Sequence, residues 1–285
     1  MMKKLYFTII NYNDYETTET LIGNIKNYKS IYKIVIVDNN STDDSFIKLK
    51  ELVNDKILVV KNSNSSYASG INFAAKTIFK EEKCFNMVVS NSDIIIKNDD
   101  DLNILNNDFK NDIGVVAPVI NTHGEKGMGW PITTPNKEIL FNIPLISRYF
   151  RKKYLGYNDS YYKDDVTEVS VVSGCFFLIS SDALKSINFL DEGTHLYYEE
   201  NILSIRLRNK GFKELIDKRV EVIHNHSVSI DKSINRINKY KELKKSQKYY
   251  VYNYLNPNII QKFLLFLMNK LSLLILYIRC LFSRS

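Results

Sequence analysis

Short apolar runs rich in Val and Ile alternate with polar stretches of helical spacing over the first 120 residues. The apolar runs predict strands at residues 5–10, 33–38, 57–61, 85–90 and 113–118. The polar stretches predict helices around residues 14–28, 43–54, 68–81 and 98–109. Fully apolar strands that alternate with helices predict an α/β fold, a mostly parallel Rossmann-like sheet with helices on both faces. Ligands of such sheets bind at the carboxyl ends of the strands, so functional residues should follow the apolar runs.

The pattern changes after residue 118. Residues 119–165 show no periodicity and contain Trp130, which predicts a functional loop region. The later predicted elements are a strand-like run at 166–180, a helix at 199–210 and a strand at 214–223.

The last 55 residues predict two amphipathic helices, a basic one over 231–252 and an apolar one after Pro257. Lys262, Lys270 and Arg279 interrupt the apolar run, so it lacks the ~18–20 uncharged residues of a spanning helix. The pattern predicts a helix that lies in a membrane interface, with its lysines at the headgroups. A helix packed on the protein core is the alternative.

Composition narrows the class of protein. The chain has 285 residues, of which 45% are hydrophobic and 25% charged, and this excludes bulk disorder and collagen-like repeats. Three widely spaced cysteines without a CxxC pair argue against a disulfide framework or a zinc site. A reducing compartment such as the cytoplasm fits best.

Charge is unevenly distributed along the chain. Residues 206–285 carry 17 Lys and Arg against 5 Asp and Glu, whereas the first 205 residues carry 22 against 27. A basic C-terminal part suggests contact with an anionic membrane or a nucleic acid, and a solvated basic face is the alternative. The apolar run after Pro257 does not suit a nucleic-acid binder, so we expect an anionic membrane surface as partner and no nucleic acid.

Polar residues follow the predicted strands, but no phosphate-binding glycine motif does. Neither GxGxxG nor GxxxxGK[ST] occurs, which argues against a dinucleotide-binding Rossmann domain and against a P-loop enzyme. Asp38 ends the second strand, where a carboxylate can accept from a base imide or a ribose hydroxyl. The loop before the third helix leads to Gly70, which allows close approach of an anionic ligand to the helix start.

Three further positions suggest chemistry. Asp93 lies two residues beyond Asn91, directly after a buried strand, where a carboxylate commonly holds a divalent cation on phosphates; a turn residue is the alternative. Glu199 and Glu200 open a predicted helix and could supply a general base, although first-turn carboxylates also suit the helix dipole. His224 ends a strand at the same edge, which makes it a candidate metal or phosphate contact.

Together these segments resemble the family 2 glycosyltransferases, inverting nucleotide-sugar enzymes with the GT-A fold, and in particular their bacterial rhamnosyltransferase-like branch. The resemblance covers about residues 4–230. The matching segments are the strand end at 12–13, the turn at 38–45, the loop at 64–72, the motif at 91–93, the segment at 189–212 and the motif from His224 to Ser229. The chain departs from the family pattern at Ser66, Ser92 and Ser227, and its Glu199-Glu200 replaces a Glu-Asp pair.

The resemblance implies a role for each matched site residue. It implies that Asp93 and His224 hold Mg²⁺ or Mn²⁺ on the donor diphosphate, and that Glu200, beside Glu199, deprotonates the acceptor hydroxyl. The nucleotide-binding residues that it implies are Tyr12, Asn13, Asp38, Asn39, Ser41, Asn64, Gly70, Asn72 and Asn91.

The expected activity is inverting transfer from a UDP- or dTDP-linked sugar to a hydroxyl of a lipid-linked glycan, in bacterial surface or capsular polysaccharide synthesis. Residues 1–230 would form the catalytic domain, with a nucleotide-binding half at 1–118 and an acceptor half at 119–230. Residues 231–285 would attach it to the inner face of the cell membrane. The alternatives are a catalytically impaired sugar-nucleotide-binding or scaffold protein and, with less support, a nucleotidyltransferase.

Overall fold

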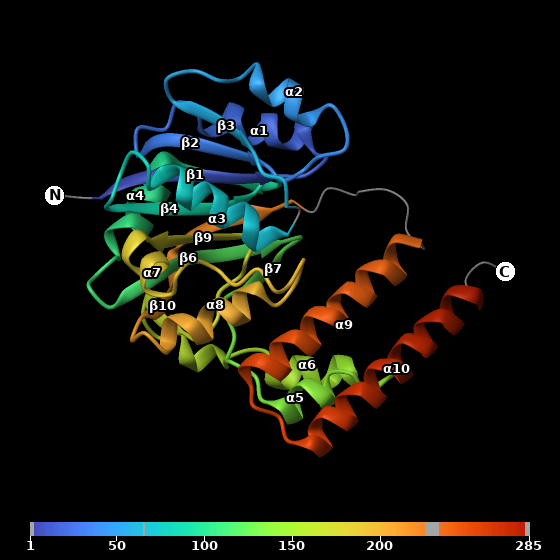
Figure 1. The fold of residues 1–285 in the computed structure, drawn as a ribbon. Helices are drawn as coiled ribbons and strands as arrows, with labels where there is room; N and C mark the ends of the chain where they lie inside the picture. The colour runs from blue at the N-terminus through green and yellow to red at the C-terminus, as the bar shows by residue number, and fades with distance from the viewer. Residues whose placement is uncertain (1–2, 65, 226–233, 283–285) are drawn as a thin grey trace.

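A computed structural model describes residues 3–64, 66–225 and 234–282 (Figure 1). The expected domain boundary at 230–231 and the motif residues Ser227 and Ser229 lie outside these described residues.

One mixed sheet contains all the strands of the described chain. They are β1 (Lys4–Asn11), β2 (Ile31–Asp38), β3 (Ile57–Lys61), β4 (Phe85–Asn91), β5 (Ile94–Ile95), β6 (Ile113–Thr122), β7 (Glu125–Gly127), β8 (Val166–Val169), β9 (Phe176–Ser180) and β10 (Lys213–His224). Their order is β3-β2-β1-β4-β9-β6-β10-β5, with β7 beside β6 and β8 beside β10. The five strands predicted in the first 120 residues are confirmed.

Helices cover both faces of the sheet, as predicted. They are α1 (Tyr15–Ile25), α2 (Ser45–Lys50), α3 (Tyr67–Ile78), α4 (Asp99–Asn107), α5 (Pro135–Leu140), α6 (Ser147–Tyr154), α7 (Ser181–Ser186), α8 (Glu199–Arg208), α9 (Ile234–Tyr254) and α10 (Ile259–Phe282), with a 3-10 turn at Asp159–Tyr161. Alternate residues of each buried strand face opposite sides. Tyr6 and Ile10 pack with α3, α7 and α8, whereas Phe7 and Ile9 pack with α1, α2 and α4.

The sheet is parallel in its first half and mixed in its second. Strands β3, β2, β1 and β4 run parallel. Strand β9 then inserts antiparallel between β4 and β6, and β10 runs parallel to β6. The predicted strand-like run at 166–180 is two strands, β8 and β9, which pair with different neighbours. Because β9 is antiparallel to both β4 and β6, those two strands run in the same direction. The carboxyl ends of β1, β2, β4, β6 and β10 therefore lie at one edge of the sheet.

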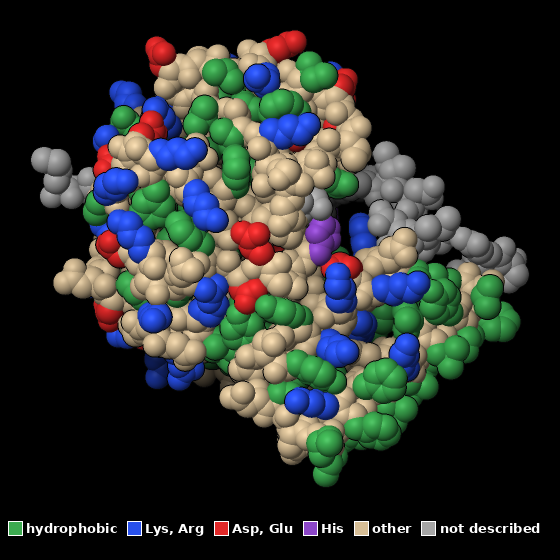
Figure 2. Space-filling view, viewed as in Figure 1, with side chains coloured by type: hydrophobic (Ala, Val, Ile, Leu, Met, Phe, Trp, Pro, Cys, Tyr) green, Lys and Arg blue, Asp and Glu red, His purple; other side chains and the backbone are tan. Residues whose placement is uncertain are grey.

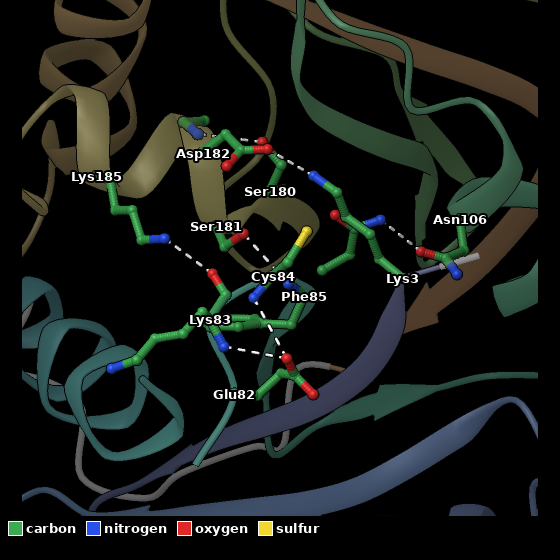
Figure 3. A network of polar contacts seen from close by, with 12 residues as sticks. Lys3, Glu82, Lys83, Cys84, Phe85, Asn106, Ser180, Ser181, Asp182 and Lys185 are labelled. Atoms are coloured by element: carbon green, nitrogen blue, oxygen red, sulfur yellow. Dashed lines mark hydrogen bonds and ion pairs between the residues drawn. The ribbon is translucent and has the colours of Figure 1, made fainter. Parts of the chain in front are cut away.

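At the opposite edge, where the amino ends of β1 and β4 lie, ion pairs and hydrogen bonds join the strands to α7 (Figure 3). The Lys3 ammonium lies 2.7 Å from the Asp182 carboxylate, and the Phe85 amide donates to the Ser181 hydroxyl at 3.2 Å. The Lys185 ammonium donates to a carbonyl at the start of β4. These contacts hold α7 against the amino ends of β1 and β4, at the edge remote from the predicted chemistry.

The C-terminal part is a helical hairpin beside α5 and α6 (Figure 1). Helix α9 packs on α8 and α5, and α10 packs on α9 and α5. Leu265 of α10 is buried in a cluster with Tyr198, Ile202, Tyr250 and Val251. Both predicted C-terminal helices are therefore present, and α9 is part of the packed protein.

Candidate active site

Strand register brings the carboxyl ends of β1, β2 and β4 together. Asn11 of β1 lies opposite Asp38 of β2, and Ile10 of β1 lies opposite Asn91 of β4. Because these pairs are parallel, their polar side chains share one edge of the sheet. This is the arrangement that the sequence predicted.

Asp38 forms the floor of this region. Its side chain is fully buried and accepts from the Asn11 amide at 3.2 Å and from the Ser41 backbone N–H at 3.2 Å. Asn13 also bonds the turn that follows Asp38. Its backbone N–H donates to the Ser41 hydroxyl, and its side chain accepts from the Thr42 N–H. Asp38 and Asn13 thus hold the 38–42 turn, and Tyr12 and Asn13 are exposed beside it. Direct contact between Asp38 and a nucleotide stays a prediction.

Two other residues that are predicted to contact the nucleotide are also buried, and their side chains hold loops in place. The Asn39 amide donates to the Ser66 carbonyl at 3.0 Å. Asn72 donates to the Leu190 carbonyl and to Glu192, and it accepts from the Leu190 N–H. The structure uses Asn39 and Asn72 to join loops, so their contact with the nucleotide is likewise still a prediction. Asn64 is exposed, and its amide donates to Glu192 at 3.3 Å.

Gly70 lets α3 approach the 38–42 turn closely. A Cβ at this position would lie 3.0 Å from Asn39 Oδ1 and 3.2 Å from a methyl of Ile10. We expect Gly70→Ala to lower the free energy of unfolding by roughly 1–3 kcal/mol, the usual range for overpacking. Gly23→Ala is the matched control, because nothing lies within 4 Å of its Cβ position, and it should gain ~0.5–1 kcal/mol from helix propensity. Urea denaturation of both variants measures the difference, and equal stabilities would contradict the close approach.

The short strand β5 brings His224 to Asp93. Ile94 of β5 pairs with His224, the last residue of β10, and the Asn225 N–H donates to the Asp93 carbonyl at 2.9 Å. The imidazole Nε2 of His224 then lies 3.2 Å from Asp93 Oδ1. Burial lowers the pKa of His224, but contacts with Asp93 and Cys175 outweigh it and raise the pKa to about 10. The structure thus brings Asp93 and His224 together, and their binding of a metal stays a prediction.

Glu199 and Glu200 face the same edge from α8. Burial and, second, the charge of Glu199 raise the pKa of Glu200 to about 8. Burial also raises the pKa of Glu199. A Cβ on Gly174, at the start of β9, would lie 3.7 Å from Glu200 Oε2, so this glycine leaves room beside the carboxylate. A raised pKa in a cleft is typical of a general acid or base.

Two cavities meet at Trp130. One of about 580 Å³ extends from the end of β6 to His224 and is lined by Tyr157 and Tyr162. A second, of about 170 Å³, is lined by Glu200. Trp130 lines both and is held by two backbone hydrogen bonds with Val171. Trp130 is only half-buried, and its place at an acceptor site stays a prediction.

The fold and site geometry can now be set beside known proteins. Residues 6–187 match the sequence model of the family described as Glycosyl transferase family 2, which is more than half of the chain. The chain belongs to glycosyl transferase family 2.

Two individual proteins are similar to this chain, one in sequence and one in structure. The chain is 22% identical over 231 residues to the low-salt glycan biosynthesis hexosyltransferase Agl10 of Haloferax volcanii, a match that covers 80% of this chain and 69% of that protein. It is also similar in fold to GalNAc-T7, solved with UDP, GalNAc and Mn²⁺, with a TM-score of 0.56 and 14% identity. That alignment covers 94% of this chain and 55% of the other, so the chain spans about half the length of that structure. The structural similarity confirms the α/β fold, and the family rests on the match over residues 6–187, while the rhamnosyltransferase-like branch stays a prediction.

The family match ends before part of the site. Glu199, Glu200 and His224 lie beyond residue 187. Their place in the site of this glycosyltransferase therefore rests on the β5–β10 pairing and on the position of α8 beside Gly174.

Three residues near the site escaped the sequence analysis. The Tyr67 hydroxyl lies 2.9 Å from both Asn91 Oδ1 and the Gly174 carbonyl, and burial raises its pKa. Cys175 raises the pKa of His224 and is thus close to it. Glu214 is buried near Glu200, and burial raises its pKa to about 8. Tyr67 opens α3 after a polar loop, whereas Cys175 and Glu214 lie beside apolar runs. None of these positions carries a sequence signal for a site, because only contacts between distant segments bring these side chains near it.

Proposed function

We propose that this family 2 glycosyltransferase moves a sugar from a UDP- or dTDP-linked donor to a hydroxyl of a glycan acceptor, with inversion at the anomeric carbon. The observation that carries the proposal is the pairing of β5 with β10, which sets Asp93 against His224 at the edge where Glu200 also faces the cleft. Residues 1–118 would hold the nucleotide and residues 119–230 the acceptor.

The Asp93–His224 pair fits a divalent cation on the donor diphosphate. Carboxylates suit Mg²⁺ and Mn²⁺, and an added imidazole nitrogen favours Mn²⁺ over Mg²⁺, which takes oxygen ligands. Among the described residues no group of three or more His, Cys, Asp or Glu side chains could hold a metal, so Asp93 and His224 would hold the cation together with the donor diphosphate. Such a cation would stabilise charge on the leaving diphosphate.

Glu200 would remove the proton from the acceptor hydroxyl. Its raised pKa of about 8 gives it more basicity than an ordinary carboxylate. The hydroxyl oxygen then forms the new bond to the anomeric carbon while the bond to the diphosphate oxygen breaks. A single displacement inverts the configuration. Trp130, Tyr157 and Tyr162 give the larger cavity aromatic walls, which suit the C–H faces of a glycan.

The acceptor that suits this enzyme is lipid-linked, because α10 presents apolar side chains to the surroundings. Ile259, Phe263 and Phe282 are 83%, 62% and 77% exposed. Figure 2 shows Lys and Arg side chains beside this apolar surface in the lower right of the view. Apolar residues next to basic ones match the acyl boundary and headgroups of an anionic membrane. We therefore place the protein at the inner face of the cell membrane.

The structure does not support the prediction that the apolar C-terminal run is too interrupted to span a membrane. By length and composition α10 could cross a membrane, with a mean hydropathy of 1.8 in its most apolar window, and no other helix of the described residues meets that criterion. Leu265 and Ser272 of α10 are nevertheless buried against the rest of the protein. A spanning helix would have to give up these contacts, which favours a helix lying in the interface.

Substitution of the exposed face of α10 should release the enzyme from membranes. Ile260 and Phe263 are 65% and 62% exposed. The double variant Ile260→Gln, Phe263→Gln should bind phosphatidylglycerol-containing vesicles roughly 10²-fold less tightly, since each side chain contributes about 1.5 kcal/mol or more when buried. Vesicle sedimentation measures the change. Leu265→Ala is the matched control: it should keep vesicle binding but lose about 2–5 kcal/mol of stability. Unchanged sedimentation of the double variant would contradict the membrane proposal.

A donor screen tests the proposed function itself. The full chain is incubated with UDP- and dTDP-sugars, Mn²⁺ or Mg²⁺, and either a soluble glycan or a lipid-linked acceptor. We expect metal-dependent release of the nucleoside diphosphate that requires an acceptor, with inverted product by NMR. Donor binding without turnover for every acceptor would instead favour the scaffold alternative, in which the Glu199-Glu200 pair is inactive.

A further inference from the structure

The backbone just before the two candidate catalytic carboxylates has an unusual conformation. Tyr197 and Tyr198 have φ angles of 74° and 69°, both in the left-handed region. Such a conformation costs on the order of 1–3 kcal/mol for each residue that is not glycine, and it persists only where surrounding contacts enforce it. Because Glu199 follows directly, these two residues set the direction in which α8 presents Glu199 and Glu200.

A buried carboxylate on α5 holds Tyr198. The Tyr198 hydroxyl donates to Glu138 Oε2 at 2.7 Å, and its ring packs on Tyr250 with centroids 5.2 Å apart. Glu138 is only 1% exposed. Its other oxygen accepts from the Thr133 hydroxyl at 2.6 Å. Both carboxylate oxygens are therefore used inside the protein, and Glu138 is not free to take part in the chemistry.

Helix α9 supplies the remaining partner of this carboxylate. Gln247 Nε2 donates to Glu138 Oε2 at 2.7 Å, and Gln247 Oε1 accepts from the Asn142 amide at 2.9 Å. Lys244, also buried on α9, donates to Asn142. A fully bonded polar cluster in a buried site fixes one arrangement of the helices around it, because each unmade bond would cost about 1–3 kcal/mol.

We propose that Glu138 and Gln247 are positioning residues, which act through Tyr198 to aim the Glu199-Glu200 pair into the cleft. This inference rests on the proposed function, since it assigns the pair to the reaction. It also makes α9 part of the catalytic unit, although the sequence analysis assigned residues 231–285 to a separate attachment segment. Figure 1 shows α5 and α9 far from β2, whose end carries the 38–42 turn, so we expect the cluster to govern turnover and not donor affinity.

Removal of single polar groups tests this role. Tyr198→Phe keeps the ring on Tyr250 and deletes only the hydroxyl. Gln247→Met keeps the length of the side chain and deletes its amide, which bonds both Glu138 and Asn142. Both should lower kcat by ~10–10²-fold, the loss expected from misplacement of a reacting group by about 1 Å. The dissociation constant for UDP with Mn²⁺ should stay within twofold of the wild-type value. Glu138→Gln, which can still accept from Tyr198, should recover most of the kcat that Glu138→Ala loses.

The control is Tyr252→Phe, which makes the same change as Tyr198→Phe but on α9, the helix that carries Gln247. Its hydroxyl donates to the Lys262 carbonyl at 3.4 Å, outside the Glu138 cluster, so kcat should be unchanged. Wild-type kcat in Tyr198→Phe and Gln247→Met would overturn the positioning role alone. Thermal melting shows the temperature at which the variants are fully folded, and kcat is also measured there. If the loss of kcat disappears at that temperature, it came from unfolding, and the positioning role would again be overturned. Absence of transfer by the wild-type enzyme would overturn the proposed function and, with it, this inference.

Discussion

Glu200→Gln is expected to lose turnover by ~10²-fold or more while the affinity for the donor is kept, because it removes the general base and little else. The amide has nearly the same shape and cannot accept the acceptor proton. Single-turnover transfer assays give kcat, and isothermal titration with the nucleotide gives donor affinity. Glu199→Gln is the matched control and should be the milder variant. If Glu199→Gln is the worse of the two, the base is Glu199; if neither matters, the protein does not use this pair.

The same carboxylate predicts the direction of the pH dependence. Only the ionised form of Glu200 can accept a proton, and burial beside Glu199 raises its pKa to about 8. At pH 7 about one tenth of the substrate-free enzyme would carry the ionised group. The kcat/KM should therefore rise with pH through pH 7 and level off above about 8, and the Glu200→Gln variant should lack this rise.

Asp93→Ala is expected to abolish chelator-sensitive transfer, with a loss of ~10²–10³-fold that corresponds to several kcal/mol of metal-assisted stabilisation. The variant should also bind UDP more weakly in the presence of Mn²⁺ and equally in its absence. Isothermal titration with and without Mn²⁺ measures this directly. Asp182→Ala, which removes a carboxylate paired with Lys3 at the opposite edge of the sheet, should show neither effect. Full activity of Asp93→Ala, or wild-type activity that is insensitive to EDTA, would exclude Asp93 as the metal ligand.

Much of the nucleotide half could be predicted because its signals are local. Strands β1 to β4 are short apolar runs bounded by polar turns, and the parallel arrangement follows from the helices between them. The chemistry-bearing residues at the ends of these strands could be named for the same reason. The sequence could not show that Asp38 and Asn72 face inward, because burial of a polar side chain depends on which partner satisfies it, such as Asn11 or Leu190.

The structure after residue 118 was harder to predict for a physical reason. Helices α5 and α6 have six and eight residues, too few for periodicity to emerge within 119–165. Strand β9 lies antiparallel between β4 and β6, a placement that only long-range pairing decides. Glu138 is the clearest example: a lone glutamate in a short segment gives no sign that Thr133, Tyr198 and Gln247 will enclose it.

The contact between β5 and β10 has a consequence for how the enzyme folds. Asp93 and His224 come from distant parts of the sequence, so the donor site proposed here would have high contact order and form only when nearly the whole sheet is assembled. Partly folded chains would lack it and could not bind the nucleotide sugar with native affinity. Donor and cation would then act as selective stabilisers of the native state, by about 2.7 kcal/mol at a free concentration of 100 Kd. In a cell, the supply of the sugar nucleotide would thus influence how much of this protein survives quality control, and not only how fast it works.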